Sequence, residues 1–540
     1  MIRKTPATLP SVAIALASAA AMPAHAQEGR RVVVAPYIEL GQVLDADLNS
    51  GDVLTYTSLA AGIDAAVATA RAQAQISYRY ERRISWDDDI GDDDIHSGLA
   101  RGTLRLVPGL SVEAGALATR TRADIRGAAP GLLTGDADNV SQLYSLYAGP
   151  SYASLIGPVS VGADYRIGYT KAETPNRGTV VAGVPRLDYY DDSLSHLATA
   201  RASIAPNTIL PVGLTASAGY EREDAGQLDA RYEGWYGRGD VLLPVSPTVA
   251  LTAGAGYERI TTSQRDPLLT AARVPVVDGN GRFVSDPASP RRVAYRTDGV
   301  YYDAGVVWRP NRRTSLEAHA GKRYGTWSYT GALAYQASKD VGLQVQVYDS
   351  VQTFGRQLRQ GLASLPTGFV NARDSYSQQF NGCVFGTSGD APGGCLNDVF
   401  QSISTASYRS RGIDGVLTAT RGRSTFGAGA GYSNRKLFAP NSGSGIVTSG
   451  LNDQSWYGQL FYARTLTSDS GVNTNAFVNY YDSDLAGGED ILSIGATASY
   501  YHVFGRLQTT GTVGLYHFDQ GSGLASALSA QALISARYTF

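Results

Sequence analysis

The sequence predicts an all-β protein: a closed antiparallel transmembrane β-barrel of about 22 strands (roughly 20–24), with short periplasmic turns and long extracellular loops. Three observations predict this fold class. Alternating polar and apolar segments continue from residue 31 to the end of the chain. Short and long connections take turns between these segments. No later stretch is continuously apolar over the roughly 18 residues that a membrane-spanning helix needs.

The beginning of the chain has the pattern of a secretory signal peptide. A short positive start is followed by an apolar run over residues 11–22 and by a small-residue cleavage site at 24–26. The apolar run is too short to cross a membrane as a helix. We therefore expect residues 1–26 to be removed and residues 27–540 to form a single outer-membrane β-barrel domain.

The alternation has the period of a β-strand. In AQAQISYRYERR, residues 72–83, polar side chains take every second position, and mostly Ala, Ile and Tyr stand between them. A period of two gives a strand two different faces. The segments 315–323 and 472–479 repeat the pattern with Ser, Glu, His, Arg and Asn on the polar face. A soluble barrel would fill its centre with large apolar residues, so we expect these apolar faces to meet lipid and the polar faces to meet the lumen.

The connections agree with a barrel that crosses a membrane. In lipid every backbone amide must be hydrogen-bonded within the protein, so the sheet has to close on itself. Tight connections rich in Pro, Gly, Asn and Asp are expected to be periplasmic turns, and the longer polar connections extracellular loops. The longer connections are predicted at 87–94, 124–139, 174–192, 263–292, 353–400 and 437–454.

The chain finishes with ALISARYTF, an alternating segment that ends on an aromatic residue. Tyr538 and Phe540 share its apolar face. This ending resembles the terminal strand by which bacterial outer-membrane barrels are recognised by their assembly machinery. We take Tyr538 and Phe540 as an assembly signal and the outer membrane as the location.

The two cysteines, Cys383 and Cys395, lie in the longest predicted loop, 353–400. The secretory route favours a disulfide between them, and closing so short a loop contributes roughly 3 kcal/mol in the chain-entropy model. The alternative is a metal-binding pair, but no histidine lies nearby in the sequence. We favour the disulfide, which would hold the loop in shape, folded over the barrel mouth or into it.

An acidic loop raises the question of a bound cation. The sequence DDDIGDDD, residues 87–94, clusters carboxylates of the kind that Ca²⁺ prefers. Asp87, Asp89, Asp92 and Asp94 are a weak Ca²⁺ candidate, and the favoured interpretation is a solvated acidic loop. Divalent ions that bridge lipopolysaccharide to the loop would be an intermediate case. We predict no cofactor and no firm metal site.

Charged residues are spread along the predicted lumen face of several strands. Rows of opposite charge across a pore orient polar solutes and tune ion selectivity. The alternative is an internal lattice of ion pairs that fills the lumen. The candidate pore-lining residues are Arg79, Glu81, Arg83, Arg101, Arg105, Glu113, Arg231, Glu317, His319, Arg323 and Arg537.

The sequence argues against several other classes of protein. It contains no HExxH, GxSxG, GxGxxG or phosphate-loop motif, so we expect no enzyme. With 46 basic and 48 acidic residues, it shows no polarity that would favour a nucleic-acid partner. Little sequence separates residue 27 from the first strand, so we expect no separate plug domain. The lumen should be open or filled by the barrel's own loops.

The segment VVWRPNRRTSLEAHAGKRYGTWSYTGALAYQAS, residues 306–338, carries a family resemblance. It resembles the outer-membrane barrels that accompany exopolysaccharide and exosortase (PEP-CTERM) loci, a β-barrel porin group. The resemblance covers about a tenth of the chain, and the acidic loop and the cysteine loop do not belong to its pattern. It implies a place in the Gram-negative cell envelope and a link to envelope polysaccharide.

Two functions follow from this fold. The first is a porin-like channel that passes small polar solutes or exopolysaccharide passively. The alternative is a loop-sealed structural or surface-binding barrel that anchors polysaccharide or lipopolysaccharide, without transport. The loop at 353–400 decides between them, because inside the lumen it constricts or seals, whereas outside it binds. The expected partners are outer-membrane lipid and lipopolysaccharide, the barrel assembly machinery, and exopolysaccharide or its export system.

Overall fold

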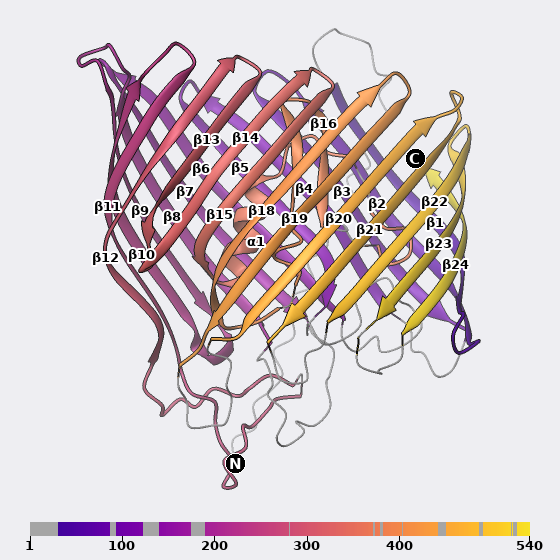
Figure 1. The fold of residues 1–540 in the computed structure, drawn as a ribbon. Coiled ribbons are helices and arrows are strands. Elements are labelled where there is room, and N and C mark those ends of the chain that lie inside the picture. The colour runs from indigo at the N-terminus through magenta and orange to yellow at the C-terminus, as the bar shows by residue number, and fades with distance from the viewer. Residues whose placement is uncertain are drawn as a thin grey trace.

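The computed structural model shows one closed β-barrel (Figure 1). Twenty-two strands form a single sheet, and the last strand pairs with the first, so the sheet has no free edge. Both the all-β fold class and the expected number of strands are confirmed. The predicted signal peptide lies outside the described residues. The structure describes residues 31–86, 93–122, 140–173, 189–279, 281–370, 373–378, 382–401, 403–440, 450–484, 490–519, 521 and 526–540.

Every barrel strand is antiparallel to the strands beside it, and all but two pairs of neighbours are also neighbours in sequence. The exceptions are the closing pair β1 and β24, and the pair β15 and β18, between which the chain forms a helix and a small hairpin. The barrel strands are β1 (Arg31–Asp47), β2 (Val53–Ala68), β3 (Ala72–Ser85), β4 (Asp93–Val107), β5 (Leu110–Arg122), β6 (Val140–Ile156), β7 (Val159–Glu173), β8 (Asp192–Ile204), β9 (Gly213–Ala225), β10 (Arg231–Pro244), β11 (Val249–Gln264), β12 (Arg292–Asn311), β13 (Thr314–Arg323), β14 (Thr326–Ser338), β15 (Val341–Gln352), β18 (Ser407–Arg421), β19 (Ser424–Phe438), β20 (Asn452–Thr465), β21 (Ser470–Ser483), β22 (Ile491–Phe504), β23 (Leu507–Asp519) and β24 (Ala527–Thr539). The other elements are η2 (Gln227–Asp229), α1 (Phe354–Ser364), β16 (Cys383–Ser388) and β17 (Ala391–Cys395).

The outer face of the barrel is apolar. Val300 is 73% exposed, Val513 62% and Ile534 75%, and each belongs to a strand whose alternate residues face the lumen. Exposure on this scale is unfavourable in water but suits hydrocarbon, where closed barrels satisfy all backbone groups. The protein is therefore an outer-membrane β-barrel, as predicted. In the part of the chain that the structure describes, no helix is long and apolar enough to span a membrane.

Short turns gather at one end of the barrel and longer connections at the other (Figure 1). At the short end, Gly109 has a φ of 83°, and a Cβ there would lie 2.5 Å from the carbonyl oxygen of Ala153. We assign this end to the periplasm and the opposite end to the outside. At the periplasmic end Phe540 donates its backbone N–H to Pro36, and Tyr538 and Phe540 contact each other on the outer face.

The chain between β15 and β18, residues 353–406, is called here the lumenal segment, and its described residues fold into the barrel. They comprise α1, the hairpin of β16 and β17, and irregular connections. Figure 1 shows α1 and β16 enclosed by the strands. Contacts with strands far around the barrel from β15 and β18 support this placement, since Arg101 of β4 donates to the carbonyl oxygen of Leu365 at 3.1 Å and Tyr376 donates to that of Gln531 in β24 at 3.0 Å.

An apolar core holds one side of the lumenal segment. Phe354, Leu358 and Leu362 recur at a helical spacing on α1 and are at most 1% exposed. They belong to one buried cluster with Leu99 of β4 and Leu143 of β6. On this side the lumen is dry, which departs from the expected polar lumen face. The reason is that these strands turn large apolar residues inward to meet a helix rather than water.

Candidate functional site in the barrel lumen

The predicted pore-lining residues of β3 do face the lumen, but they lie beneath the lumenal segment. Arg79, Glu81 and Arg83 are 6%, 2% and 6% exposed. Glu81 accepts hydrogen bonds from both arginines at 2.8 Å, and Arg79 also pairs with Glu39 at 3.0 Å. Arg83 donates to the backbone carbonyl of Tyr376. This row therefore positions the segment and lines no open water column.

Other predicted lumen residues also form ion pairs with the barrel wall. Arg231 pairs with Asp224 at 2.5 Å. Arg537 pairs with Asp64 at 2.5 Å and lies over the ring of Tyr37. In the described chain, this part of the lumen thus fits the alternative that an internal lattice of ion pairs fills it.

Two further candidates of the predicted set differ in their surroundings. Glu113 pairs with Arg166 between β5 and β7. Arg105 is exposed near the periplasmic turn after β4. Neither residue contacts the lumenal segment through a hydrogen bond or ion pair among the described residues.

The remaining three candidates lie on β13, on the opposite side of the lumen from the apolar core. His319 contacts Glu317 at 2.9 Å and Asp303 at 3.1 Å, and Asp303 also pairs with Arg238. Arg323 donates to Glu258 of β11 at 2.7 Å. The side chain of Glu317 is 50% exposed, so this wall is open to solvent.

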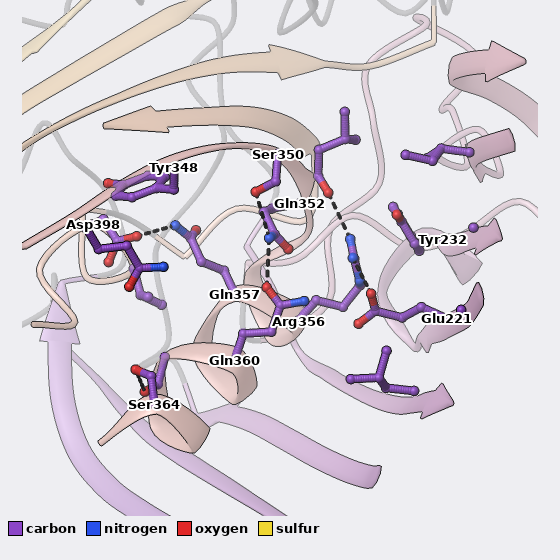
Figure 2. A pocket seen from close by; sticks show the side chains of 18 of the residues that line it. Glu221, Tyr232, Tyr348, Ser350, Gln352, Arg356, Gln357, Gln360, Ser364 and Asp398 are labelled. Carbon is purple, nitrogen blue, oxygen red and sulfur yellow. Dashed lines mark hydrogen bonds and ion pairs between the residues drawn. The ribbon is translucent and has the colours of Figure 1, made fainter. Parts of the chain in front are cut away.

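A cavity of about 340 Å³ lies between this wall and the polar face of α1. Strands β9, β10, β11, β13, β15 and β18 contribute to it, and Figure 2 shows how the side chains converge. The amphipathic helix explains its position, because α1 turns its leucines to the apolar core and its glutamines to the opposite side. The labelled residues of the cavity wall in Figure 2 are Glu221, Tyr232, Tyr348, Ser350, Gln352, Arg356, Gln357, Gln360, Ser364 and Asp398.

Two bridges connect α1 to the strands at the outer end of the cavity (Figure 2). Arg356 donates to the carbonyl oxygen of Val351 at 3.0 Å and to Glu221 of β9 at 2.5 Å. Gln352 of β15 donates to Gln360 at 2.8 Å. Together they tie the first two turns of α1 to both β9 and β15.

Burial changes along the cavity from its outer end toward the periplasm. Val351 and Phe354 are each 1% exposed, and Gln352 is 6% exposed. Gln346 of β15 and Ser364 at the end of α1 are exposed. The cavity is therefore closed on its extracellular side and open toward the periplasmic half of the lumen.

The acidic side chains of the cavity differ in whether they have a cationic partner. Glu221 is shared between Arg356 and Arg359, which is 1% exposed. Asp398 has no ion pair within the described chain, and it accepts a hydrogen bond from Gln357 at 2.6 Å. Because its surroundings withhold water from the carboxylate, burial raises the pKa of Asp398 to about 6.

The raised pKa of Asp398 predicts tighter docking of the lumenal segment in acid. Its pKa is about 6 when docked and 3.8 in the reference state, so the stabilisation is complete below pH 3.8 and lost as the pH rises through 6. The difference is worth at most about 3 kcal/mol. Three other side chains face the Asp398 carboxylate, namely Asp414 of β18, Arg435 of β19 and Gln357 of α1. The test variant leaves these three residues unchanged. Hydrogen exchange of α1, corrected for intrinsic rates, should be slower at pH 5 than at pH 7.5, and Asp398→Asn should reduce the difference.

Cys383 and Cys395 form a disulfide that closes the hairpin of β16 and β17. The hairpin lies against the wall, where the backbone N–H of Cys383 donates to the side-chain oxygen of Gln459 in β20 at 2.9 Å. Phe385 is fully buried and stacks near Phe461 of β20. The longest predicted loop thus lies inside the lumen, with its hairpin packed on β18, β19 and β20. The hairpin tip reaches the periplasmic end, where Gly389 donates its N–H to the carbonyl oxygen of Lys339 at 2.8 Å.

Replacing both cysteines with serine should loosen this hairpin. The lost loop constraint is worth up to about 3 kcal/mol. We expect faster hydrogen exchange over residues 383–395, with the barrel still assembled because Phe385 keeps its packing. Identical exchange in the double variant and the parent would contradict a role for the disulfide in holding the segment.

The acidic-loop candidate falls largely outside the described residues, since Asp87, Asp89 and Asp92 are not part of them. Asp94 accepts a hydrogen bond from Tyr80 at 2.7 Å and pairs with Arg82 at 2.7 Å. In the chain that the structure describes, no group of three or more His, Cys, Asp or Glu side chains is placed to hold a metal ion.

Sequence reasoning missed the helix and therefore the cavity. Residues 354–364 fall in a connection that we expect to be a loop, although Phe354, Leu358 and Leu362 have the spacing of an amphipathic helix. That signal could have found α1. The partnership of Glu221 with Arg356 and Arg359 has no local signal, because the ion pairs join positions more than a hundred residues apart.

Comparisons with known proteins describe the shape of the chain and give it no family. No family model and no curated protein matches. Among solved structures, the FrpB iron transporter (F5-1 variant) from Neisseria meningitidis is 10% identical with a TM-score of 0.42, covering 94% of this chain and 82% of that one. The siderophore receptor PiuA from Acinetobacter baumannii is 10% identical with a TM-score of 0.42, covering 93% and 82%. The ferric-catecholate import receptor Fiu from E. coli K12 is 10% identical with a TM-score of 0.41, covering 93% and 81%.

Proposed function

We propose that the protein is a porin-like outer-membrane channel that passes small polar solutes passively, along a route between α1 and the strands β9 to β15. The observation that carries the proposal is the cavity of about 340 Å³ with a polar lining, in a lumen whose other side is packed with apolar side chains. A pore this narrow suits small solutes, and an exopolysaccharide chain would require the lumenal segment to move aside. The resemblance to barrels of exopolysaccharide loci favours envelope sugars as solutes.

The two bridges at the outer end are the gate of this proposed route. Arg356 and Gln360 hold α1 against Glu221 and Gln352, and both bridges must break before a solute can pass. The bridge between Gln352 and Gln360 consists of neutral amides that water can replace. The pair of Arg356 with Glu221 is a buried ion pair, so it keeps the route closed most of the time. We expect low conductance with brief openings in the resting protein.

A second candidate function is the loop-sealed barrel that anchors polysaccharide or lipopolysaccharide at the cell surface. The buried apolar cluster between α1 and β4 to β6 favours it, because that contact closes one side of the lumen permanently. It leaves the polar cavity without a role, which is why we place it second.

Single-channel recording of refolded protein in a planar bilayer separates the two functions. The channel predicts small, flickering steps that become longer in Gln360→Ala, which removes the bridge to Gln352. The matched control is Gln336→Ala on β14, whose side chain lies on the lumen-facing register outside the cavity. A folded barrel that stays silent in all three proteins would refute the channel and leave the anchoring function.

A further inference from the structure

The cavity beside α1 is lined mainly by amides and phenols rather than by charges. An amide offers a donor and an acceptor in one plane, whereas a carboxylate only accepts and an arginine only donates. Tyrosine adds a flat apolar ring to a hydroxyl. The amide side chains of the lining are Gln344, Gln346, Gln352, Gln357 and Gln360. The tyrosines are Tyr220, Tyr232, Tyr236, Tyr324 and Tyr348.

These groups form two facing rows. On β15 the alternate residues from Gln344 to Gln352 point into the cavity, and Gln346 is directly paired across the strands with Asp414 of β18. On the helix, Gln357 and Gln360 lie one turn apart on the side that faces them (Figure 2). A ligand between the rows would meet hydrogen-bonding groups on both sides.

Several oxygen atoms in the cavity can accept further hydrogen bonds. The side chain of Gln352 is buried, yet its Oε1 atom has no hydrogen-bond partner in the described structure. Asp398 accepts one hydrogen bond from Gln357, and Asp414 has no ion pair within the described chain. These oxygens can receive hydroxyl hydrogens from a ligand.

The charges of the lining disfavour an anionic ligand. Both lining arginines are already paired, Arg323 with Glu258 and Arg356 with Glu221. Asp398 is left as negative charge without a cationic partner in the described chain. An anion would therefore meet repulsion and find no free guanidinium.

We infer that this cavity binds an uncharged saccharide of one or two sugar residues, held by hydroxyl hydrogen bonds to the two glutamine rows. Each sugar hydroxyl both donates and accepts, as the amides do, and the tyrosine rings can cover the apolar face of the sugar. A volume of about 340 Å³ is that of a small-ligand site. The inference rests on the proposed function in taking the ligand as the solute that passes.

Three probes with the same pyranose ring test the ligand class: glucose, glucosamine and glucuronate, with maltose as the disaccharide. Saturation-transfer NMR on the full-length protein, in a detergent that carries no sugar, detects weak binding without any need for conduction. We expect binding of glucose and maltose, and little or none of glucuronate. Equal or tighter binding of glucuronate, or no binding of any probe, would overturn the inference.

Variants locate the site and separate hydroxyl recognition from cation binding. Gln346→Leu should weaken maltose binding about five- to tenfold, the loss of one or two hydrogen bonds. Gln336→Leu, outside the cavity, should leave it unchanged. Asp414→Asn keeps an acceptor without the charge and should change maltose binding less than about threefold. If it abolishes binding and glucosamine binds far better than glucose, the site is cationic and the inference is wrong.

The two proposals can fail separately. Binding of maltose by a barrel that never conducts supports the saccharide site and removes the channel. Conduction by a barrel that binds none of the probes removes the site and leaves the channel.

Discussion

Removing the lumenal segment should convert the barrel into a wide, permanently open pore. Gln352 and Tyr408 are direct partners across β15 and β18, so an Asn-Gly turn can replace residues 354–406 without disturbing the ladder. We expect single-channel conductance to rise on the order of tenfold, because barrels of this size enclose a wide lumen unless it is plugged. The measurement is planar-bilayer recording of the refolded variant, with folding checked by heat-modifiable migration.

A second deletion serves as its control. The β11–β12 connection can be shortened between Pro267 and Ser285, which pair across it, without touching the lumenal segment. We expect this variant to conduct nearly as the parent does. If the first deletion folds and still conducts no better than the control, the lumenal segment is not what closes the barrel.

Glu221→Gln should release α1 from the wall. The substitution removes the one carboxylate that Arg356 and Arg359 share, and these side chains are 4% and 1% exposed. Leaving buried charges without a partner costs about 3–5 kcal/mol. Hydrogen exchange of residues 354–364 should accelerate by roughly 10²–10³-fold, since about 1.4 kcal/mol corresponds to a factor of ten.

The matched control for this substitution is Glu317→Gln. Glu317 is also a lumen-wall carboxylate, but it is half exposed, contacts His319 and lies away from α1. Exchange of α1 should then stay within a few-fold of the parent. Equal effects of the two substitutions would mean that the Glu221 pairs do not anchor the helix.

The barrel itself was predictable from the sequence because its rules are local. Alternation fixes which residues of 72–83 face lipid, and the turn residues around Gly109 fix where strands end. Each strand pairs with its neighbour in sequence, so no long-range information is needed except between β15 and β18 and at the closing pair of β1 and β24. The pairing of β1 with β24 follows from closure of a sheet with an even number of strands.

The contents of the lumen were not predictable in the same way. Tyr376 reaches β23 and β24, and Arg83 of β3 reaches Tyr376, across hundreds of positions with no repeating pattern. Polar residues on a strand look alike whether they face water or a buried segment. For this reason Arg79 and Arg83 were correctly placed on the lumen face, while their burial beneath the segment was not foreseen.

The proposed channel depends on a lumenal segment that closes the outer mouth above the cavity. A single cysteine at Gln346 tests this directly, because in the described chain both native cysteines are joined in the disulfide. Intact cells are treated from outside with a polyethylene-glycol maleimide too large for the cavity, in the full-length protein and in the variant lacking residues 354–406. We expect Gln346→Cys to be protected in the full-length protein and labelled in the deletion variant. Rapid labelling of the full-length protein from outside would show that the lumenal segment does not close the outer mouth.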